Sequence, residues 1–468
     1  MSFVLITAPF KSGILGGGFI RSNKVVPYLI QLLRKYVDNI IIYIPANTIR
    51  INANVLSSSL NITIEDAYER TYKELRDFII RNNVSAQTLE VVDLIISQTL
   101  SYDKKLHSSY KEYKTLYDKI WGFGPFYIFE TIRFEKVHNI IEDNQSLVGA
   151  YSTNENMEFL YSLYKIAIGS HIPTSFMMQL PIIYDRVLNY SMLRLNRTLI
   201  HALSTEVFNK FIENILIRIM RQGLLKVIIG VSPSVFLSER FMSIVRRYNV
   251  RLGVPFPANA VDEQVFRFRR IEGKEPLAVF FARLTPNKGI FELLRAWKIV
   301  EKEIPNAKLR IMGMFGSEEH KVEFFKLMRI LNLRNVEFLG FIKDREELYR
   351  LVSESKVLIY PSHEDAFPLV VLESLALGVA VVAYNIPAIK YVYRGLPNVF
   401  TVPEYDYAAL AKEAIRVLRM SESEYVKLHE NDTVRRFLEL HSSWENVARA
   451  EFNLLGPYIE YSLSRVRR

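Results

Sequence analysis

The sequence predicts an α/β protein made of two doubly wound, Rossmann-like domains. Three observations carry this prediction. Buried-strand runs alternate with segments of helical spacing at both ends of the chain, which is the pattern of parallel sheets. The 468 residues are too many for one ordinary core and suit two domains. The stretch 247–266 contains two prolines between short turn signals, as a linker between domains does.

The first domain is expected to span 1–257 and to begin with a strand, a glycine-rich loop and a helix. These elements and the next strand are expected, in order, at 3–9, 11–18, 23–37 and 39–45. Residues 62–141 are mostly polar with helical spacing, and we interpret them as a helical insertion. The alternation of strands and helices then returns with SLVGAYS and ENMEFLYSLYK.

The second domain is expected to span 258–438 and to repeat the alternation without an insertion. Its expected strands are, in order, LAVFFARL, AKLRIMG, VEFLGF, KVLIYPS, AVVAYN and NVFTVP. Helical spacing fills the segments between the first five. A last helical segment, 439–468, closes the chain.

Composition limits the classes of partner and compartment. Cysteine is absent, which excludes disulfides, thiol catalysis and Cys-ligated metals. The net charge of +10 favours phosphorylated molecules or an acidic membrane face, unless it reflects only solvated basic faces. Nucleic acid is not expected, because zinc-finger spacing and RNP-like motifs are missing. No run reaches the ~18 apolar residues of a membrane span, so we expect a cytoplasmic protein, soluble or peripheral at the inner membrane face.

Two cations flank a strand-to-helix turn in FFARLTPNKG. Arg283 ends the expected strand, and Lys288 lies where the next helix starts. An arginine fork and a lysine point charge at this place can clamp a diphosphate, helped by the positive field of the helix N-terminus. The alternative is that one or both are ordinary surface cations.

The stretch SHEDAFPLVVLESLALG combines a polar loop with an apolar helix that carries one acid. The helix is expected from about Pro368 to Leu377, ended by Gly378. The N–H groups of Leu369 and Val370 would then hold phosphate oxygens. Glu373, one turn further, would accept two ribose hydroxyls. The alternative is a capped surface helix with a solvated glutamate.

Two further loops are candidate ligand contacts. In LGFIKDREEL, a glycine at the strand end lets the main chain of Phe341 and Ile342 approach and read a base edge, unless this is a plain turn. The run Gly16, Gly17 and Gly18 does not fit a nicotinamide fingerprint, and we interpret it as a loop that meets phosphate or acceptor. A mobile loop without ligand is the alternative.

The ordered motifs of the second half resemble family-4 glycosyltransferases of the GT-B fold (glycosyl transferases group 1). They are A-R-L-T-P-N-K-G, L-R-I-M-G, F-L-G-F, Y-P-S and D-A-F-P-L-V-V-L-E; VSPSV, NAVDEQVF and SWENVA extend the resemblance over about 226–455. It implies two Rossmann-like domains facing across a cleft, with the final helix crossing back to the first domain. The implied activity is a retaining sugar transfer from a nucleotide-diphosphate sugar, with no metal and no cofactor.

The resemblance also assigns roles to individual residues. Arg283 and Lys288 match the diphosphate clamp, Glu373 matches the ribose ligand, and Asp365 matches the first acid of E-x7-E, near the donor sugar. Asp365 is therefore a catalytic candidate, although it is shorter than the family's acid, and Phe367 and Pro368 of the same motif are candidate substrate-binding residues. His171, in IAIGSHIP, matches a histidine that often ends a strand of the first domain; its role is either catalytic or structural.

The acceptor is expected to be a glycan or a lipid-linked glycan, and a small soluble sugar is the alternative. The helix VFNKFIENILIRIMRQG is a candidate for peripheral membrane contact, although its apolar face would more often belong to a core. Asp365 and the absence of a histidine after SLVGAYS motivate one more alternative, a non-catalytic nucleotide-sugar-binding subunit.

Overall fold

The computed structural model describes residues 1–8, 17–60, 62–84, 96, 99–100, 147–183 and 198–466. It divides into two compact units. Unit 1 comprises Met1–Val231, Val235–Ala258 and Val447–Arg468, and unit 2 comprises Ser232–Ser234 and Asn259–Asn446. One boundary therefore falls inside the linker-like stretch 247–266, and another falls within the last helix.

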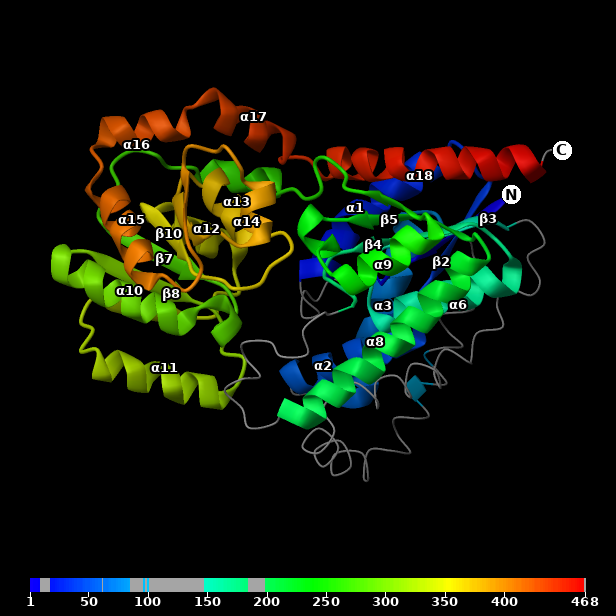
Figure 1. Cartoon of the computed structure of the whole chain (residues 1–468), viewed down its shortest axis with the longest axis horizontal. Coiled ribbons are helices and arrows are strands. Elements are labelled where there is room, and N and C mark those ends of the chain that lie inside the picture. The colour runs from blue at the N-terminus through cyan, green and yellow to red at the C-terminus, as the bar shows by residue number, and fades with distance from the viewer. Residues whose placement is uncertain are drawn as a thin grey trace. The chain divides into compact units, whose positions relative to one another are not determined.

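Unit 1 is built on a six-stranded parallel sheet in the order β2-β1-β3-β4-β5-β6. Its strands are β1 (Ser2–Ile6), β2 (Asn39–Tyr43), β3 (Leu147–Ser152), β4 (Thr174–Met178), β5 (Leu225–Gly230) and β6 (Arg251–Gly253). Its helices include α1 (Gly17–Leu33), α2 (Ala46–Leu60), α3 (Ile64–Arg81), α6 (Met157–Ser170), α8 (Thr198–Arg221) and α9 (Glu239–Tyr248), as Figure 1 shows. The strand order reverses between β1 and β3, and sheets of this kind bind ligands beyond the carboxyl ends of such strands.

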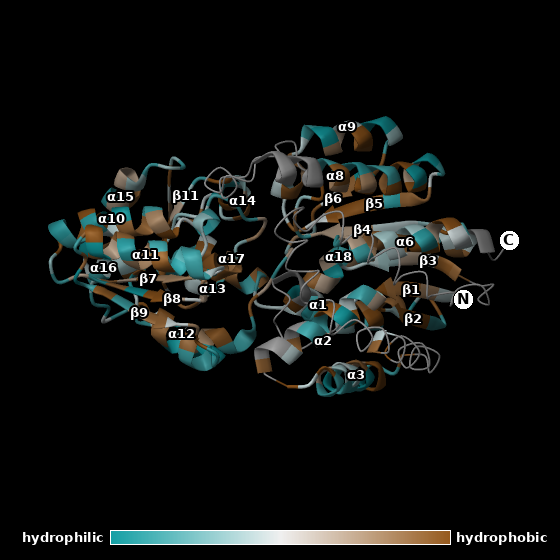
Figure 2. Cartoon of the chain, turned by 90° about the horizontal axis from the view of Figure 1, so that it is seen from below, coloured by the Kyte–Doolittle hydropathy of each residue, from teal (hydrophilic) through white to brown (hydrophobic). Residues whose placement is uncertain are grey.

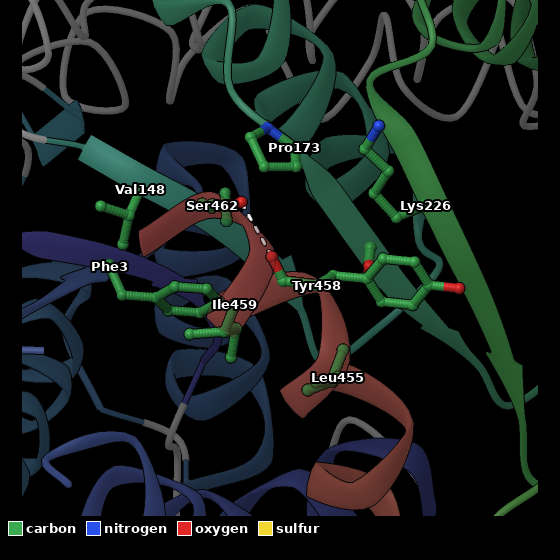
Figure 3. Close-up of a pocket in the computed structure, with 11 residues that line it drawn as sticks. Phe3, Val148, Pro173, Lys226, Leu455, Tyr458, Ile459 and Ser462 are labelled. Atoms are coloured by element: carbon green, nitrogen blue, oxygen red, sulfur yellow. Dashed lines mark hydrogen bonds between the residues drawn. The ribbon is translucent and has the colours of Figure 1, made fainter. Parts of the chain in front are cut away.

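Most of the last helix, α18 (Trp444–Val466), packs on unit 1. Glu451 accepts hydrogen bonds from the Tyr151 hydroxyl (2.6 Å) and from Nη2 of Arg21 (2.5 Å), and all three side chains are buried. Figure 3 shows the next turns of α18 against the amino ends of the strands, around a hollow of about 10 Å³. Its labelled residues include Phe3, Val148, Leu455, Tyr458 and Ile459. A hollow of this size holds about one water molecule and is no ligand site.

Two expectations for the first half can be judged in unit 1. Part of the predicted helical insertion is helical, since α3 spans Ile64–Arg81 with Thr63 as its N-cap; most of 85–141 lies outside the described residues. Helix α8 buries its apolar face, including Ile212, Leu216 and Ile219, so that face belongs to the core. Along 206–221, where its side chains are described, the side of α8 that faces away from the core is mainly polar, with Lys210, Arg218 and Arg221 exposed beside Val207.

Unit 2 is built on a second six-stranded parallel sheet, in the order β12-β11-β10-β7-β8-β9. Its strands are β7 (Leu277–Phe281), β8 (Lys308–Met312), β9 (Val336–Gly340), β10 (Val357–Tyr360), β11 (Ala380–Tyr384) and β12 (Val399–Val402). Its α-helices are α10 (Ile290–Glu303), α11 (Glu318–Ile330), α12 (Arg345–Ser353), α13 (Leu369–Ala376), α14 (Pro387–Val392), α15 (Tyr407–Arg419), α16 (Glu422–His429) and α17 (Asp432–Leu440). All six strands lie where the sequence predicts them. The strand order reverses between β7 and β10, which makes this pair the switch point of unit 2.

Hydrophobic strands form the centre of both units, and the helices turn charged faces outward. In Figure 2 the strands β5 and β7 have the hydrophobic colour, while α3 and α12 carry much of the hydrophilic colour. In unit 2, α10 packs on α15 and buries Trp297, and α13 packs on β10 and β11. Within the described part of the chain, no helix is long and apolar enough to cross a membrane.

Candidate functional site

Two loops leave the sheet of unit 2 at its switch point and are bonded to each other. The strands β7 and β10 pair through Ala278 and Val357, so the loops that follow them start side by side. The His363 N–H donates to the Asn287 carbonyl at 2.9 Å. Gly289 has φ 73°, and a Cβ there would lie 1.9 Å from the Pro361 oxygen, so only glycine allows this approach.

The first loop carries both predicted cations. Arg283 is exposed, and among the described residues its side chain has no hydrogen bond or ion pair. Lys288 is mostly buried; its Nζ donates to the Glu364 carbonyl (2.9 Å) and to Oδ2 of Asp365 (2.7 Å). A lysine ammonium has three donors, so one N–H remains for a ligand. The switch point therefore presents one unpaired cation and one that is shared with an acid.

Asp365 is held by three donors within its own unit. Oδ2 accepts from Lys288 and from the buried Tyr360 hydroxyl at 2.6 Å, and Oδ1 accepts from the Ala366 N–H at 2.9 Å. Burial, followed by the charge of Asp365, raises the pKa of Tyr360 well above its usual value, so the hydroxyl stays protonated and donates. The short side chain of Asp365 is thus folded back onto the loop and onto Lys288.

Helix α13 has the predicted position to within a residue. It spans Leu369–Ala376 with Pro368 as N-cap, and Gly378 follows with φ 75°. In an α-helix the first N–H groups have no acceptor inside the helix, so those of Leu369 and Val370 can bind an anion.

Glu373 lies on the second turn of α13 and is 7% exposed, unlike a solvated surface acid. It accepts a hydrogen bond from Nη2 of Arg345, the first residue of α12. Burial raises the pKa of Glu373, and the Arg345 charge opposes that rise. The carboxylate is therefore stabilised by an ion pair that sequence reasoning missed, because its partner stands 28 residues away in the chain.

The loop after β9 completes this edge of the sheet. Gly340 ends the strand with φ 70°, Phe341 is 60% exposed and Ile342 is half-buried. The Gly313 N–H donates to the Gly340 carbonyl at 2.8 Å, and a Cβ on Gly313 would lie 1.9 Å from the Ala282 oxygen. The backbones that follow β7, β8 and β9 are therefore in close contact, which glycine at these positions permits.

A buried charged cluster supports the second loop. His363 Nδ1 lies 2.8 Å from Glu404 and Nε2 lies 3.8 Å from Glu292, and its ring stacks on Tyr405. Burial lowers the pKa of His363, but the two carboxylates outweigh it and raise the pKa to about 9. His363 is thus a cation at neutral pH that joins the loops after β7, β10 and β12. No sequence motif predicts this role for His363.

Further contacts fix the segment between Asp365 and α13. The hydroxyls of Ser232 and Ser234 both donate to the Ala366 carbonyl, at 2.6 and 3.2 Å. Phe367 is buried with its ring 5.9 Å from that of Tyr393, whose hydroxyl donates to the Pro368 carbonyl. Phe367 therefore anchors the loop by packing.

The carboxyl edge of the unit 1 sheet carries a neutral polar network at its own switch point. It consists of side chains that follow β1, β3 and β4 or lie on α1, namely Thr7, Ser22, Thr153 and Gln179. The carboxylate of buried Glu155 accepts from the Gln179 N–H at 2.9 Å. Burial raises the pKa of Glu155 to about 7, despite the opposing backbone hydrogen bonds. Sequence reasoning missed this acid, although it stands directly after a strand end.

The glycine run is only partly described. Gly17 and Gly18 form the start of α1, whereas Gly16 lies outside the described residues. The predicted contact of this run with phosphate or acceptor stays a prediction.

His171 does not end a strand. IAIG forms the last turns of α6, because its apolar residues continue that helix's buried face; His171 is the left-handed residue (φ 52°) that terminates it. The strand is the next segment, Thr174–Met178, so His171 precedes it. His171 is exposed at the amino edge of the sheet, away from the carboxyl ends where ligands bind, and we leave it out of the site.

Across the described ranges, no three His, Asp or Glu side chains gather in a way that could hold a metal ion.

Comparison with known proteins gives a family match within unit 2 and several similar glycosyltransferases. Residues 261–433 match the family model of glycosyl transferases group 1. An uncharacterized glycosyltransferase of Methanocaldococcus jannaschii is 30% identical over 204 residues, which is 42% of this chain and 50% of that protein. The Staphylococcus aureus capsular polysaccharide biosynthesis glycosyltransferase CapM is 29% identical over 140 residues, or 30% of this chain and 36% of CapM. The matched segments thus span half or less of these relatives.

A solved glycosyltransferase from Rickettsia africae has the same fold along nearly the whole chain. Its TM-score is 0.57 at 14% identity, with 98% of each chain covered. Together with the two parallel sheets, this confirms the predicted fold class, GT-B with two Rossmann-like units. The predicted resemblance to glycosyl transferases group 1 is confirmed over 261–433.

Proposed function

We propose that this chain is a retaining glycosyltransferase that moves a sugar from a nucleotide-diphosphate sugar to an acceptor hydroxyl without a metal ion. One observation carries the proposal. The cations Arg283 and Lys288 and the N-terminus of α13 stand on the two loops that leave the switch point of unit 2. This is where doubly wound sheets bind nucleotides, and these groups suit a diphosphate.

The chemistry asks mainly for charge stabilisation. The bond between the sugar C1 and the diphosphate oxygen breaks, and a bond from C1 to the acceptor oxygen forms on the same face. Negative charge develops on the leaving diphosphate, where Arg283, the free N–H of Lys288 and the α13 N-terminus would stabilise it. The acceptor proton passes to a leaving phosphate oxygen, so no strong protein base is needed. Phe341 and Ile342 would contact the base, and Glu373 the ribose.

The acceptor is proposed to be a glycan or a lipid-linked glycan. The similarity to a capsular polysaccharide biosynthesis glycosyltransferase supports this class. Peripheral contact with an acidic membrane would use exposed cations of α8 such as Lys210 and Arg221, since the apolar face of that helix is in the core. Flotation with anionic vesicles at low salt tests this contact, and failure to float would remove it.

A non-catalytic nucleotide-sugar-binding subunit is the second candidate. It is favoured by the retraction of Asp365 onto Lys288 and Tyr360, which leaves this acid engaged away from a donor sugar.

The deciding experiment has two steps. A thermal-shift screen of the full chain against nucleotide sugars should raise the melting midpoint for the donors that bind. The best donor is then incubated with the protein, and nucleoside diphosphate release is measured with and without candidate acceptors. Release supports the transferase, stabilisation without release supports the binding subunit, and a lack of any stabilisation contradicts both.

A further inference from the structure

Arg345 stands between two parts of the proposed nucleotide site. It is the first residue of α12, directly after the loop 341–344 that follows β9. Its guanidinium pairs with Oε1 of Glu373 and donates to the Tyr349 hydroxyl at 2.9 Å. The same group lies 5.0 Å from the centre of the Tyr349 ring, which is buried. Arg345 is thus held at two points although its side chain is 53% exposed.

The pair engages only one of the two carboxylate oxygens. Oε1 of Glu373 accepts from Arg345. Within the described residues no donor reaches Oε2, and this atom is not sealed from solvent. The neighbours of Glu373 on α13 are apolar apart from Ser374, whose hydroxyl donates to the Val370 carbonyl, so the helix itself offers the carboxylate no partner. The arrangement fixes the carboxylate and leaves one acceptor free.

We propose that Arg345 is a positioning residue of the nucleotide site: it fixes Oε1 of Glu373 so that Oε2 faces the ligand and accepts a hydroxyl of the ribose. This inference rests on the proposed function and narrows it. Glu373 was expected to accept two ribose hydroxyls. Because Arg345 already engages Oε1, Oε2 is the stronger acceptor, and the hydroxyl that it binds makes the stronger, charge-assisted hydrogen bond. The site should therefore depend on one of the two hydroxyls more than on the other.

The surroundings of Glu373 predict what happens without Arg345. Four charged or titratable groups act on Glu373. They are Arg345 and Tyr349 from α12, Asp262 at the start of the short 3₁₀ helix Glu263–Phe268, and Tyr393 after α14. Arg345 supplies the positive charge of this set. Its removal leaves burial and the Asp262 charge, which both raise the pKa of Glu373. The carboxylate would then take up a proton as the pH falls, and its acceptor function would be lost at the acid side.

The test is titration calorimetry of the full chain with uridine diphosphate and adenosine diphosphate and with their 2′-deoxy and 3′-deoxy analogues, at pH 6 and pH 8.5. For the wild type, removal of one hydroxyl should weaken binding about tenfold, and removal of the other about twofold or less. In Arg345→Ala the discrimination should be smaller than in the wild type, and smaller at pH 6 than at pH 8.5. Arg345→Lys should restore part of it at pH 6, and Arg350→Ala, an exposed arginine of the same helix, should match the wild type.

Glu373→Gln serves as the second variant, because it keeps the shape of the side chain and removes the charge. It should lose the discrimination at both pH values. Equal ribose-to-deoxyribose ratios in the wild type and in Arg345→Ala at pH 6 would overturn the inference and leave the proposed function standing. If no nucleoside diphosphate binds to the wild type, the inference and the proposed function fall together.

Discussion

The carboxyl edges of the two sheets differ in how their buried polar side chains are paired. In unit 2 each conspicuous acid has a cation: Lys288 for Asp365 and Arg345 for Glu373. In unit 1 the described part of the edge holds a network of neutral hydrogen-bonding side chains around Thr153, and the acid Glu155 beside it accepts from a backbone N–H. Paired charges suit a charged ligand such as a diphosphate, and neutral hydrogen-bonding side chains suit hydroxyl groups. We therefore propose that unit 2 binds the donor and unit 1 the acceptor.

The largest effect is expected from Arg283→Ala, which removes the exposed, unpaired cation of the charged edge. Affinity for the nucleotide-diphosphate donor should fall about 100-fold, because a charge-assisted contact with phosphate is lost. The measurement is the donor Kd of the purified chain at fixed salt. Arg435→Ala, which removes an exposed arginine of α17, is the matched control and should leave the Kd unchanged. An unchanged Kd in Arg283→Ala would break the comparison on the unit 2 side.

Glu155→Gln tests whether the acid at the unit 1 edge is protonated in the folded protein. In the folded protein the pKa of Glu155 is about 7, above its ordinary value of 4.5, so the folded protein binds a proton on Glu155 more tightly than the unfolded chain does. The stability of the wild type should therefore fall as pH rises from 4.5 to 7. The glutamine variant escapes this loss and should be more stable than the wild type by about 1–3 kcal/mol at pH 8, and about equal to it at pH 5.

The measurement is the thermal melting midpoint of the wild type and of Glu155→Gln between pH 5 and pH 8. A variant whose advantage is the same at pH 5 and pH 8 would show that Glu155 stays ionised in the folded protein.

A smaller effect is expected from His363→Gln in the charged cluster of unit 2. In the folded protein the pKa of His363 is about 9, above its ordinary value of 6.5. The ion pairs with Glu292 and Glu404 therefore stabilise the protein fully below pH 6.5. That contribution is lost as pH rises through 9. The variant should be less stable by about 1 kcal/mol at pH 6, with a difference that shrinks by pH 9.5. A pH-independent difference in melting midpoint would instead assign His363 a packing role.

Much of unit 2 could be predicted because its signals are local. A strand end followed within a few residues by a helix start fixes the positions of Arg283, Lys288 and α13, and parallel strands bring those positions to one edge. The ion-pair partners could not be predicted, because Arg345 meets Glu373 through tertiary packing of two helices. The fold of Asp365 onto Lys288 likewise depends on a contact between residues 77 apart in the chain.

Unit 1 was harder to predict for a different reason. A short apolar run such as IAIG fits the end of a helix as well as a strand, and the choice of strand displaced His171 to the wrong edge of the sheet. The polar network around Thr153 and Glu155 has no sequence signature, because its members are ordinary small or acidic residues. Only the register of the strands brings them together.

If the charged edge of unit 2 binds a nucleoside diphosphate, calorimetric titration of the wild type will show it. The ligands are uridine diphosphate, adenosine diphosphate and their two parent nucleosides, each measured at two salt concentrations. At least one diphosphate should bind about 100-fold or more tightly than its nucleoside. Added salt should reduce this ratio of affinities, because the contacts with the diphosphate are ionic. Equal affinities for a diphosphate and its nucleoside, or a difference that salt leaves unchanged, would contradict binding at this charged edge.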